Sequence, residues 1–264
     1  MASPRLVAKI ESEEPSTRLA VLIDADNAQA SVIEGLLAEI ASFGEATVKR
    51  IYGDFTSQQS SSWKKVLQKY SIKPIQQFAY TTGKNATDSA LIIDAMDLLY
   101  TRKFDGFCLV TSDSDFTGLA VRIREEGLTV LGFGEEKTPE AFRNACHKFI
   151  FTEVLRPAGT PSTTNSSERT SQPAPQKTEE IPHKPAPFPK ELLLAALEKS
   201  SDESGWADLA PFGSYLNNVQ SDFDPRRYGH KKLSDLVRSR PDIFQIEERV
   251  PDGQTNKKLY VRAK

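Results

Sequence analysis

A short apolar run that ends in two carboxylates constrains the fold of this chain more than any other stretch. Residues 107–110 are continuously apolar, as in a strand buried on both faces, and Asp113 and Asp115 follow almost at once. A helical spacing of apolar residues begins at Phe116. Strand, acidic turn and helix in this order predict a βα unit of a parallel sheet. The two carboxylates then lie at the carboxyl end of the strand, where open α/β sheets bind their ligands.

The same alternation of strand and helix patterns continues from residue 18 to residue 155. Apolar runs predict strands at 19–23, 47–52, 72–78, 106–110, 129–133 and 149–154. Pro74 weakens the third run and predicts an edge strand. Between the strands, Ser31 and Thr87 are predicted helix N-caps, and Pro139 is predicted as the first residue of a helix. This alternation predicts βαβ units and therefore a three-layer, Rossmann-like α/β domain around a parallel sheet.

Composition indicates a globular protein with no special class of partner. The 264 residues suggest one or two domains, and 38% hydrophobic and 27% charged residues are ordinary values for a soluble protein. The net charge of -2 argues against a strongly basic nucleic-acid binder. Two cysteines without metal-ligand spacing suit a reducing compartment. Because no stretch approaches 18 apolar residues and the N-terminus has no apolar signal core, we expect a cytoplasmic protein.

The composition shifts sharply after residue 156. Residues 157–189 contain eight of the sixteen prolines among Ser, Thr and Gln, and such a stretch cannot bury a core. We therefore predict a disordered N-terminus (1–17), an α/β domain (18–155), a flexible linker (156–189) and a second domain (190–264). The second domain has three helical patterns, then two β-rich stretches around the turn signal at 251–253. Three helices and a hairpin predict a small winged helix.

Four aspartates are predicted to converge at one edge of the sheet. Asp24 ends the first strand as Asp113 follows the fourth, and these two strands are neighbours in a doubly wound sheet. Asp88 opens the long helix, on the stripe that faces the sheet. Taken singly, Asp115 or Asp113 could be a helix cap and Asp88 a first-turn residue that favours the helix dipole. Four such residues at one edge favour a site.

A cluster of carboxylates implies a hard divalent cation. Two carboxylates about 4 Å apart repel by roughly 4 kcal/mol at an effective dielectric constant near 20, and a cation relieves that cost. Mg²⁺ or Mn²⁺ takes oxygen ligands, keeps bound waters and can promote attack of water on a phosphodiester. The three histidines, at 147, 183 and 230, lie outside the cluster in sequence. The aspartates alone therefore carry the predicted metal site.

Three short motifs in the predicted α/β domain resemble one known family. They are Asp24-Ala25-Asp26-Asn27, Lys84 with Asp88, and Thr111-Ser112-Asp113-Ser114-Asp115-Phe116. In this order they resemble the NYN domain, a branch of the PIN-like metal-dependent ribonucleases, over residues 18–155. The resemblance implies a PIN-like fold, hydrolysis of RNA, and Asp24, Asp88, Asp113 and Asp115 as catalytic, Mg²⁺-binding residues. It also implies that Asn27, Lys84 and Ser112 bind substrate. The family usually has glycine where this chain has Thr111.

The second domain resembles the LOTUS domain, also called OST-HTH, a winged helix found together with NYN domains. Gly205-Trp206-Ala207, 223–229 and 232–236 carry this resemblance. It implies binding of RNA or docking of a protein partner. Basic residues in the same region are candidates for phosphate contacts, although a solvated helix face is an equally good reading of such a run. These residues are Arg226, Arg227, Lys231 and Lys232.

Two other functions fit parts of the sequence. Asp24-Ala25-Asp26 after a first strand also resembles the start of a haloacid-dehalogenase-type phosphatase, with one Asp as the nucleophile. The following Asn27-Ala28 departs from the Gly-Thr that is usual in those enzymes. The second alternative is an RNA-binding adaptor that does not cleave. The prediction we favour is a Mg²⁺- or Mn²⁺-dependent ribonuclease that acts on single-stranded RNA.

Overall fold

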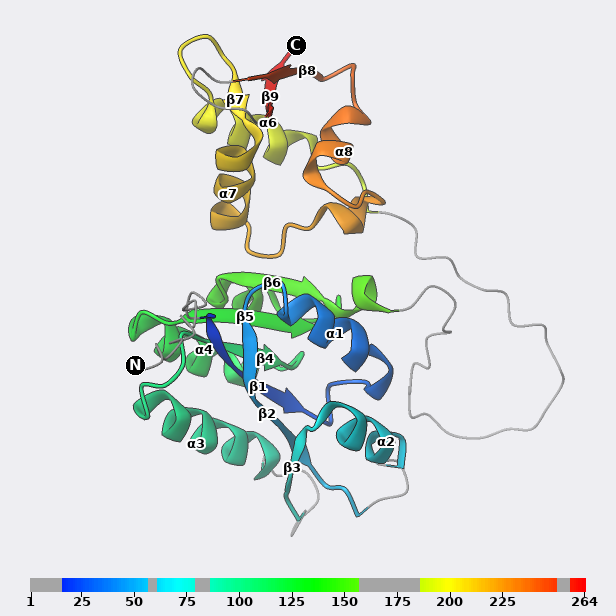
Figure 1. The fold of residues 1–264 in the computed structure, drawn as a ribbon, viewed down its shortest axis with the longest axis vertical. Helices are drawn as coiled ribbons and strands as arrows, with labels where there is room; N and C mark the ends of the chain where they lie inside the picture. The colour runs from blue at the N-terminus through cyan, green and yellow to red at the C-terminus, as the bar shows by residue number, and fades with distance from the viewer. Residues whose placement is uncertain (1–15, 57–60, 79–85, 157–185, 251–256) are drawn as a thin grey trace, which may run out of the picture. The chain divides into compact units, whose positions relative to one another are not determined.

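The computed structural model describes residues 16–56, 61–78, 86–156, 186–250 and 257–264. These residues form an α/β domain ahead of residue 157 and a smaller domain of helices and short strands after residue 185 (Figure 1). Within these ranges, no helix has both the length and the apolar character needed to cross a membrane.

The first domain alternates strands and helices, as predicted. Its strands are β1 (Arg18–Asp24), β2 (Glu45–Gly53), β3 (Lys73–Gln76), β4 (Gly106–Val110), β5 (Thr129–Gly134) and β6 (Lys148–Phe151). Its helices are α1 (Ile33–Ile40), α2 (Ser61–Tyr70), α3 (Ala86–Tyr100), α4 (Thr117–Glu125) and α5 (Glu140–Ala145), with 3-10 turns η1 (Ala30–Val32), η3 (Ser114–Phe116) and η4 (Thr152–Leu155). The strands form one parallel sheet in the order β3-β2-β1-β4-β5-β6.

The sheet is covered on both faces, which confirms the predicted three layers. Helices α1 and α2 lie on one side of the sheet, and α3 and α4 lie on the other (Figure 1). The central strands β1 and β4 are almost entirely buried, which explains their continuous apolar sequence. Strand β3, with Pro74, lies at an edge as predicted. Because β1 and β4 are hydrogen-bonded neighbours, their carboxyl ends open at the same point of the sheet.

Several helix starts differ from the prediction by one or two residues. Ser31 lies within the 3-10 turn η1, and α1 begins after it at Ile33 with no side-chain cap. Thr87 lies inside α3, which begins at Ala86. Pro139 is the N-cap of α5 with an extended ψ of 143°, so the helix starts at Glu140. The last strand ends at Phe151, because the chain turns there into η4.

The second domain has the predicted three helices and a small sheet. Its elements are α6 (Lys190–Ser200), β7 (Ala207–Asp208), α7 (Leu209–Val219), η5 (Pro225–Tyr228), α8 (Leu233–Arg238), β8 (Phe244–Arg249) and β9 (Lys258–Ala263). The strands form an antiparallel sheet in the order β7-β9-β8, in which the short β7 was not predicted. The predicted turn at 251–253 lies outside the described residues.

The core of the second domain lies between its helices and its sheet. Leu193, Phe212 and Leu236 from the three helices are fully buried in it. Phe188, which the sequence analysis placed in the linker, packs against this core and stacks in a tilted arrangement on Phe244. The packed part of the domain therefore includes residue 188. This is the helix-plus-sheet arrangement of a winged helix.

A candidate metal centre at the carboxyl edge of the sheet

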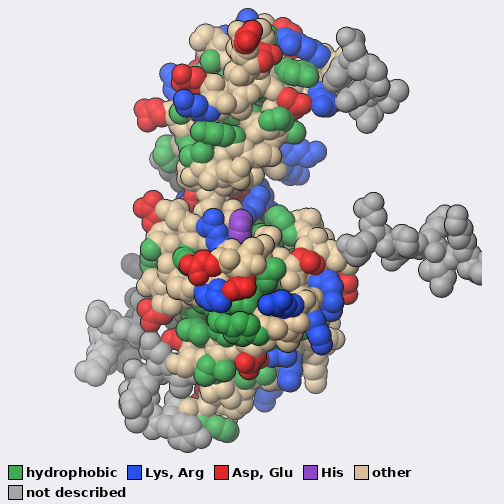
Figure 2. Space-filling view, turned by 90° about the vertical axis from the view of Figure 1, so that its left-hand side faces the viewer, with side chains coloured by type: hydrophobic (Ala, Val, Ile, Leu, Met, Phe, Trp, Pro, Cys, Tyr) green, Lys and Arg blue, Asp and Glu red, His purple; other side chains and the backbone are tan. Residues whose placement is uncertain are grey.

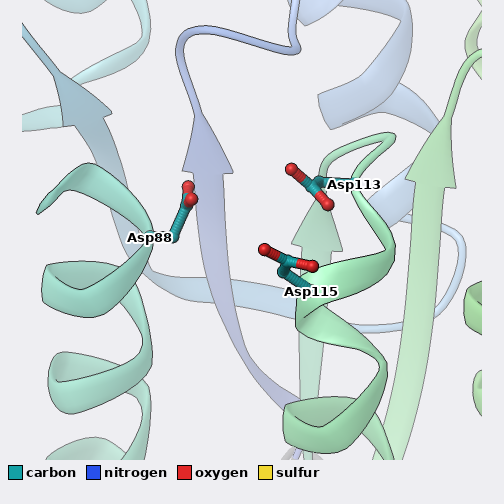
Figure 3. A group of neighbouring side chains, drawn as sticks. All are labelled: Asp88, Asp113 and Asp115. Carbon is teal, nitrogen blue, oxygen red and sulfur yellow. The ribbon is translucent and has the colours of Figure 1, made fainter. Parts of the chain in front are cut away.

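Three carboxylates converge where β1 and β4 end. Asp88 comes from the first turn of α3, Asp113 from the loop after β4, and Asp115 from the 3-10 turn η3. Each offers one carboxylate oxygen, and these oxygens all lie within 4.8 Å of one another. Figure 3 shows the three side chains directed toward a common space between α3 and the β4 loop. Asp88 and Asp113 are half-buried and Asp115 is exposed, so solvent and a substrate can reach the group.

This donor set fits a hard divalent cation. At 4.8 Å, two carboxylates repel by roughly 3–4 kcal/mol at an effective dielectric constant near 20, and three of them repel in three pairs. Mg²⁺ and Mn²⁺ prefer carboxylate oxygens and retain water ligands, so three protein ligands are enough to bind either of them. A bound cation would offset the repulsion among Asp88, Asp113 and Asp115.

Asp24, the fourth predicted ligand, has a different environment. It is fully buried and does not belong to the carboxylate group found among the described residues. Its Oδ2 accepts hydrogen bonds from the side chains of Asn27 (2.7 Å) and Thr111 (3.0 Å). Its Oδ1 accepts one from the backbone N–H of Asp26 (3.0 Å). Burial raises the pKa of Asp24, while the hydrogen bonds from Asn27 and Thr111 act in the opposite direction.

These bonds give Asp24 a structural role beside the group of three carboxylates. Through Thr111, the carboxylate ties the end of β1 to the end of β4, two residues before Asp113. Thr111 stands where the NYN family usually has glycine, and its hydroxyl is one of the donors. The departure from the family pattern therefore adds a hydrogen bond at the point where the two strands open.

The predicted substrate-binding residues are placed as follows. Asn27 donates its side-chain amide to Asp24. Ser112 is buried, and its Oγ accepts a hydrogen bond from the backbone N–H of Glu135 (2.9 Å), directly after β5. Ser112 therefore fixes the loop that carries Asp113 against the neighbouring strand. Lys84 lies outside the described residues.

Asp54 is a residue at this edge that was not among the residues predicted from the sequence. It follows β2, and its Oδ1 accepts hydrogen bonds from the Thr56 N–H (3.0 Å), the Thr56 hydroxyl (2.6 Å) and the Gln76 amide (2.8 Å). These hydrogen bonds lower the pKa of Asp54. The signal was available, because Asp54 directly follows its strand, much as Asp24 is the last residue of β1. Its three bonds fix the turn after β2 and join it to the end of β3.

The end of β2 also approaches the β1 turn closely. A Cβ atom added at Gly53 would lie 2.7 Å from the Cβ atom of Ala25, which is closer than real Cβ contacts allow. The backbone N–H of Ala25 donates to the carbonyl of Tyr52 at 2.9 Å. The glycine therefore lets the turn that follows Asp24 lie directly against β2.

The four predicted basic residues of the second domain have unequal environments. The Arg226 guanidinium binds the buried Asp224 carboxylate through Nε (3.0 Å) and Nη2 (2.6 Å). Arg227 is half-buried, and its backbone N–H donates to the Asp224 carbonyl. Lys231 and Lys232 are exposed just before α8. Of these four residues, only Lys231 and Lys232 have exposed side chains. A phosphate can reach them without breaking the Arg226–Asp224 ion pair.

This difference predicts separate effects for two variants of the second domain. Arg226→Gln should lower the free energy of unfolding of that domain by about 1–3 kcal/mol, because it leaves the buried Asp224 short of a charged donor. The double variant Lys231→Gln/Lys232→Gln should leave stability within about 0.5 kcal/mol of wild type. It should instead flatten the log-log salt dependence of binding to single-stranded RNA by roughly 0.7 per lost contact.

Urea unfolding and fluorescence anisotropy with a labelled RNA measure these two quantities. An Arg226→Gln protein of wild-type stability with the flatter salt slope would instead place Arg226 on the RNA surface.

Comparisons with known proteins agree with this architecture. A model of the NYN domain matches residues 18–155, and a model of the OST-HTH/LOTUS domain matches residues 183–255. The comparison with curated proteins returned no match.

Three solved structures are similar to parts of the chain, and their names state no function. An uncharacterized protein from Nitrosomonas europaea is 51% identical, with a TM-score of 0.29, over 38% of this chain and 92% of its own. A protein of unknown function from Vibrio parahaemolyticus is 16% identical, with a TM-score of 0.45, over 53% and 94% of the two chains. A protein from Chromobacterium violaceum is 31% identical, with a TM-score of 0.24, over 31% and 87%.

The two family models cover the α/β domain and the winged helix, and both match the resemblances found in the sequence motifs. The three carboxylates come from two of those motifs and lie together at the carboxyl edge of the sheet. This chain belongs to the NYN domain family and carries an OST-HTH/LOTUS domain after the NYN domain.

Proposed function

We propose that this protein is a nuclease that hydrolyses RNA and depends on Mg²⁺ or Mn²⁺. The observation that carries the proposal is the convergence of Asp88, Asp113 and Asp115 at the open carboxyl edge of an NYN domain. Their exposure matters, because a metal that activates water for attack on a phosphodiester must be reached by both water and substrate. An OST-HTH/LOTUS domain in the same chain supports RNA as the substrate.

The charges of the chain explain why a cation would be needed for the substrate to bind. Three carboxylates and a phosphodiester are all anionic, so the metal-free site repels RNA. Figure 2 shows acidic and basic side chains interspersed on the face turned to the viewer, without a large field of one sign. At the acidic group itself, attraction of the phosphate would depend on the ion that Asp88, Asp113 and Asp115 hold, because all three side chains are anionic. When bound, that ion supplies positive charge for the phosphate and lowers the pKa of water.

The residues around the three carboxylates hold them in place. Asp24 joins the ends of β1 and β4, and Ser112 joins the loop after β4 to the residue after β5. These bonds tie the two residues just before Asp113 to β1 and to the residue after β5, so the start of its loop is held at both neighbouring strands. We infer single-stranded RNA as the substrate, because a flexible strand can bring its phosphate to a site at the rim of a sheet without unwinding a duplex.

The burial of Asp24 argues against the phosphatase alternative. A phosphatase of that type would use the Asp at the end of β1 as a nucleophile, and a nucleophile must reach the phosphorus atom. Asp24 has no exposed surface, and it accepts three hydrogen bonds.

Within this proposal we also place the protein in the cytoplasm, because its two buried cysteines are free thiols that suit a reducing compartment.

A cleavage assay with end-labelled single-stranded RNA tests the proposal. Wild-type protein should cleave with Mg²⁺ or Mn²⁺ and not with EDTA, and it should not hydrolyse a generic phosphatase ester. Binding of RNA without cleavage under every metal condition would favour the non-catalytic adaptor. Turnover of the ester alone would favour the phosphatase. If the winged helix docks a protein instead, deletion of 186–264 would leave RNA binding unchanged.

Metal binding should be visible as increased stability even without RNA. A ligand that binds only the folded protein stabilises it by about 2.7 kcal/mol at one hundred times its Kd. We therefore expect Mn²⁺ to raise the midpoint of thermal unfolding of wild type and to leave that of Asp113→Asn unchanged. Differential scanning fluorimetry over a Mn²⁺ titration measures both. An equal shift in the two proteins would mean that the ion binds elsewhere.

A further inference from the structure

A polar network joins α3 to β2, six residues along the helix from Asp88. Arg50 and Tyr52 are two residues apart on β2, so both side chains point to the same face of the sheet. The Arg50 guanidinium donates to one oxygen of Asp94 on α3, and the Tyr52 hydroxyl donates to the other. The Arg50 and Asp94 side chains are only 23% and 22% exposed, and Tyr52 is fully buried. Burial also raises the pKa of Tyr52, so its hydroxyl remains a donor at neutral pH.

This network restricts a helix that apolar packing alone would leave free to shift. The inward face of α3 is lined by Leu91, Ala95, Leu98 and Leu99, all buried. Burial of apolar surface is not directional, so such a stripe tolerates small rotations and translations of the helix on the sheet. The Asp94 carboxylate receives one hydrogen bond on each oxygen, from two side chains of one strand. This arrangement does not tolerate such shifts of the helix. Buried polar groups set register in this way in other helical contacts.

The position of Asp88 depends on the rotation and height of α3. Asp88 and Asp94 are six residues apart, which is about 9 Å along the helix axis. A carboxylate lies roughly 5–6 Å from the axis, so a rotation of about 20° would move it by roughly 2 Å. Asp113 and Asp115 follow β4 and would not move with the helix. A displacement of this size would separate the Asp88 oxygen from the other two, and misplacement of even 1 Å can cost about a hundredfold in activity.

The donors are themselves fixed at the edge of the sheet that bears the site. Tyr52 pairs with Asp24 in the register of β1 and β2, and its carbonyl accepts from the Ala25 N–H. Strand β2, whose side chains hold Asp94, is therefore paired with β1. The end of β1 is in turn joined to the end of β4 through the Asp24–Thr111 hydrogen bond. The network therefore fixes the position of α3 relative to the loop that carries Asp113.

We propose that Asp94, held by Arg50 and Tyr52, is a positioning residue that sets the register of α3 and so brings Asp88 to the metal site. The inference rests on the proposed function, because it requires that Asp88, Asp113 and Asp115 bind a metal ion. It predicts that metal affinity depends on a hydroxyl and a guanidinium that do not bind the metal.

Direct Mn²⁺ binding by the full chain, measured by electron paramagnetic resonance, tests this inference without an activity assay. Tyr52→Phe removes one hydrogen bond and no charge, so a loss of affinity of about tenfold would come from positioning alone. Arg50→Gln separates the two physical effects by sign. Removal of a positive charge would strengthen cation binding by electrostatics, whereas loss of positioning weakens it. We expect weaker binding in both variants, at a temperature where circular dichroism shows that each is folded.

Asp97→Asn is the matched control, because Asp97 is an exposed aspartate on the same helix and lies farther from Asp88. Its charge is screened by solvent, so Mn²⁺ affinity should stay at the wild-type value. Unchanged affinity in Tyr52→Phe, or tighter binding in Arg50→Gln, would overturn the positioning role and leave the proposed function intact. If wild type has no Mn²⁺ site that Asp113→Asn removes, the proposed function fails and this inference fails with it.

Discussion

Replacement of Asp113 by asparagine is expected to reduce Mg²⁺-dependent RNA cleavage by about 10²–10⁴-fold, the range for loss of a group that acts on the reacting centre. The domain should remain folded. Asp113 belongs to a group of three carboxylates whose oxygens lie within 4.8 Å, so the substitution removes repulsion from the metal-free protein. The free energy of unfolding in EDTA should therefore equal or slightly exceed that of wild type.

Glu136→Gln provides the control for this loss of charge. Glu136 is exposed just after β5, at the same edge of the sheet and outside the group of three. The variant should cleave RNA at close to the wild-type rate, measured under single-turnover conditions with end-labelled RNA. Full activity of Asp113→Asn would remove the carboxylate group from the mechanism. An equal loss in both variants would point to a general effect of charge on RNA binding.

Asp24→Ala should show the opposite pattern, with a large effect on stability. The substitution removes a fully buried acceptor from three donors, namely the Asn27 amide, the Thr111 hydroxyl and the Asp26 N–H. An unsatisfied buried group costs about 1–3 kcal/mol, and removal of a desolvated carboxylate returns part of that cost. We expect the free energy of unfolding to fall by about 2–4 kcal/mol, measured by urea denaturation in EDTA.

Asp24→Asn is the conservative comparison. Its side-chain oxygen can still accept from Asn27 and Thr111, so it should lose less stability than the alanine variant. The outcome also separates the two roles considered for Asp24. Wild-type stability in Asp24→Ala, together with complete loss of Mn²⁺ binding, would make Asp24 a metal ligand in its own right, as the family resemblance implies.

Much of the fold follows from the order of patterns along the chain. Continuous apolar runs predicted β1 and β4 as the buried centre of the sheet, and Pro74 predicted β3 as an edge. These predictions succeed because a strand covered on both faces needs apolar side chains throughout, and because proline cannot donate to a sheet ladder. Element boundaries were less accurate. The start of α5 depends on the ψ angle of Pro139, which the sequence does not specify.

The order of patterns along the chain was enough to predict Asp24, Asp88, Asp113 and Asp115 at the carboxyl edge of the sheet, because each follows or ends a strand or opens a helix at that edge. Their environments come from tertiary packing, which buries Asp24 and leaves Asp88, Asp113 and Asp115 accessible. Burial and hydrogen bonding depend on residues such as Thr111, which lies 87 positions from Asp24 along the chain. Arg226 is a different case, because its partner Asp224 lies only two positions away, and what the tertiary structure adds is the burial of the Asp224 carboxylate. Local patterns carry the periodicity of helices and strands, whereas the burial of a charged group is set by packing between segments that are distant in sequence.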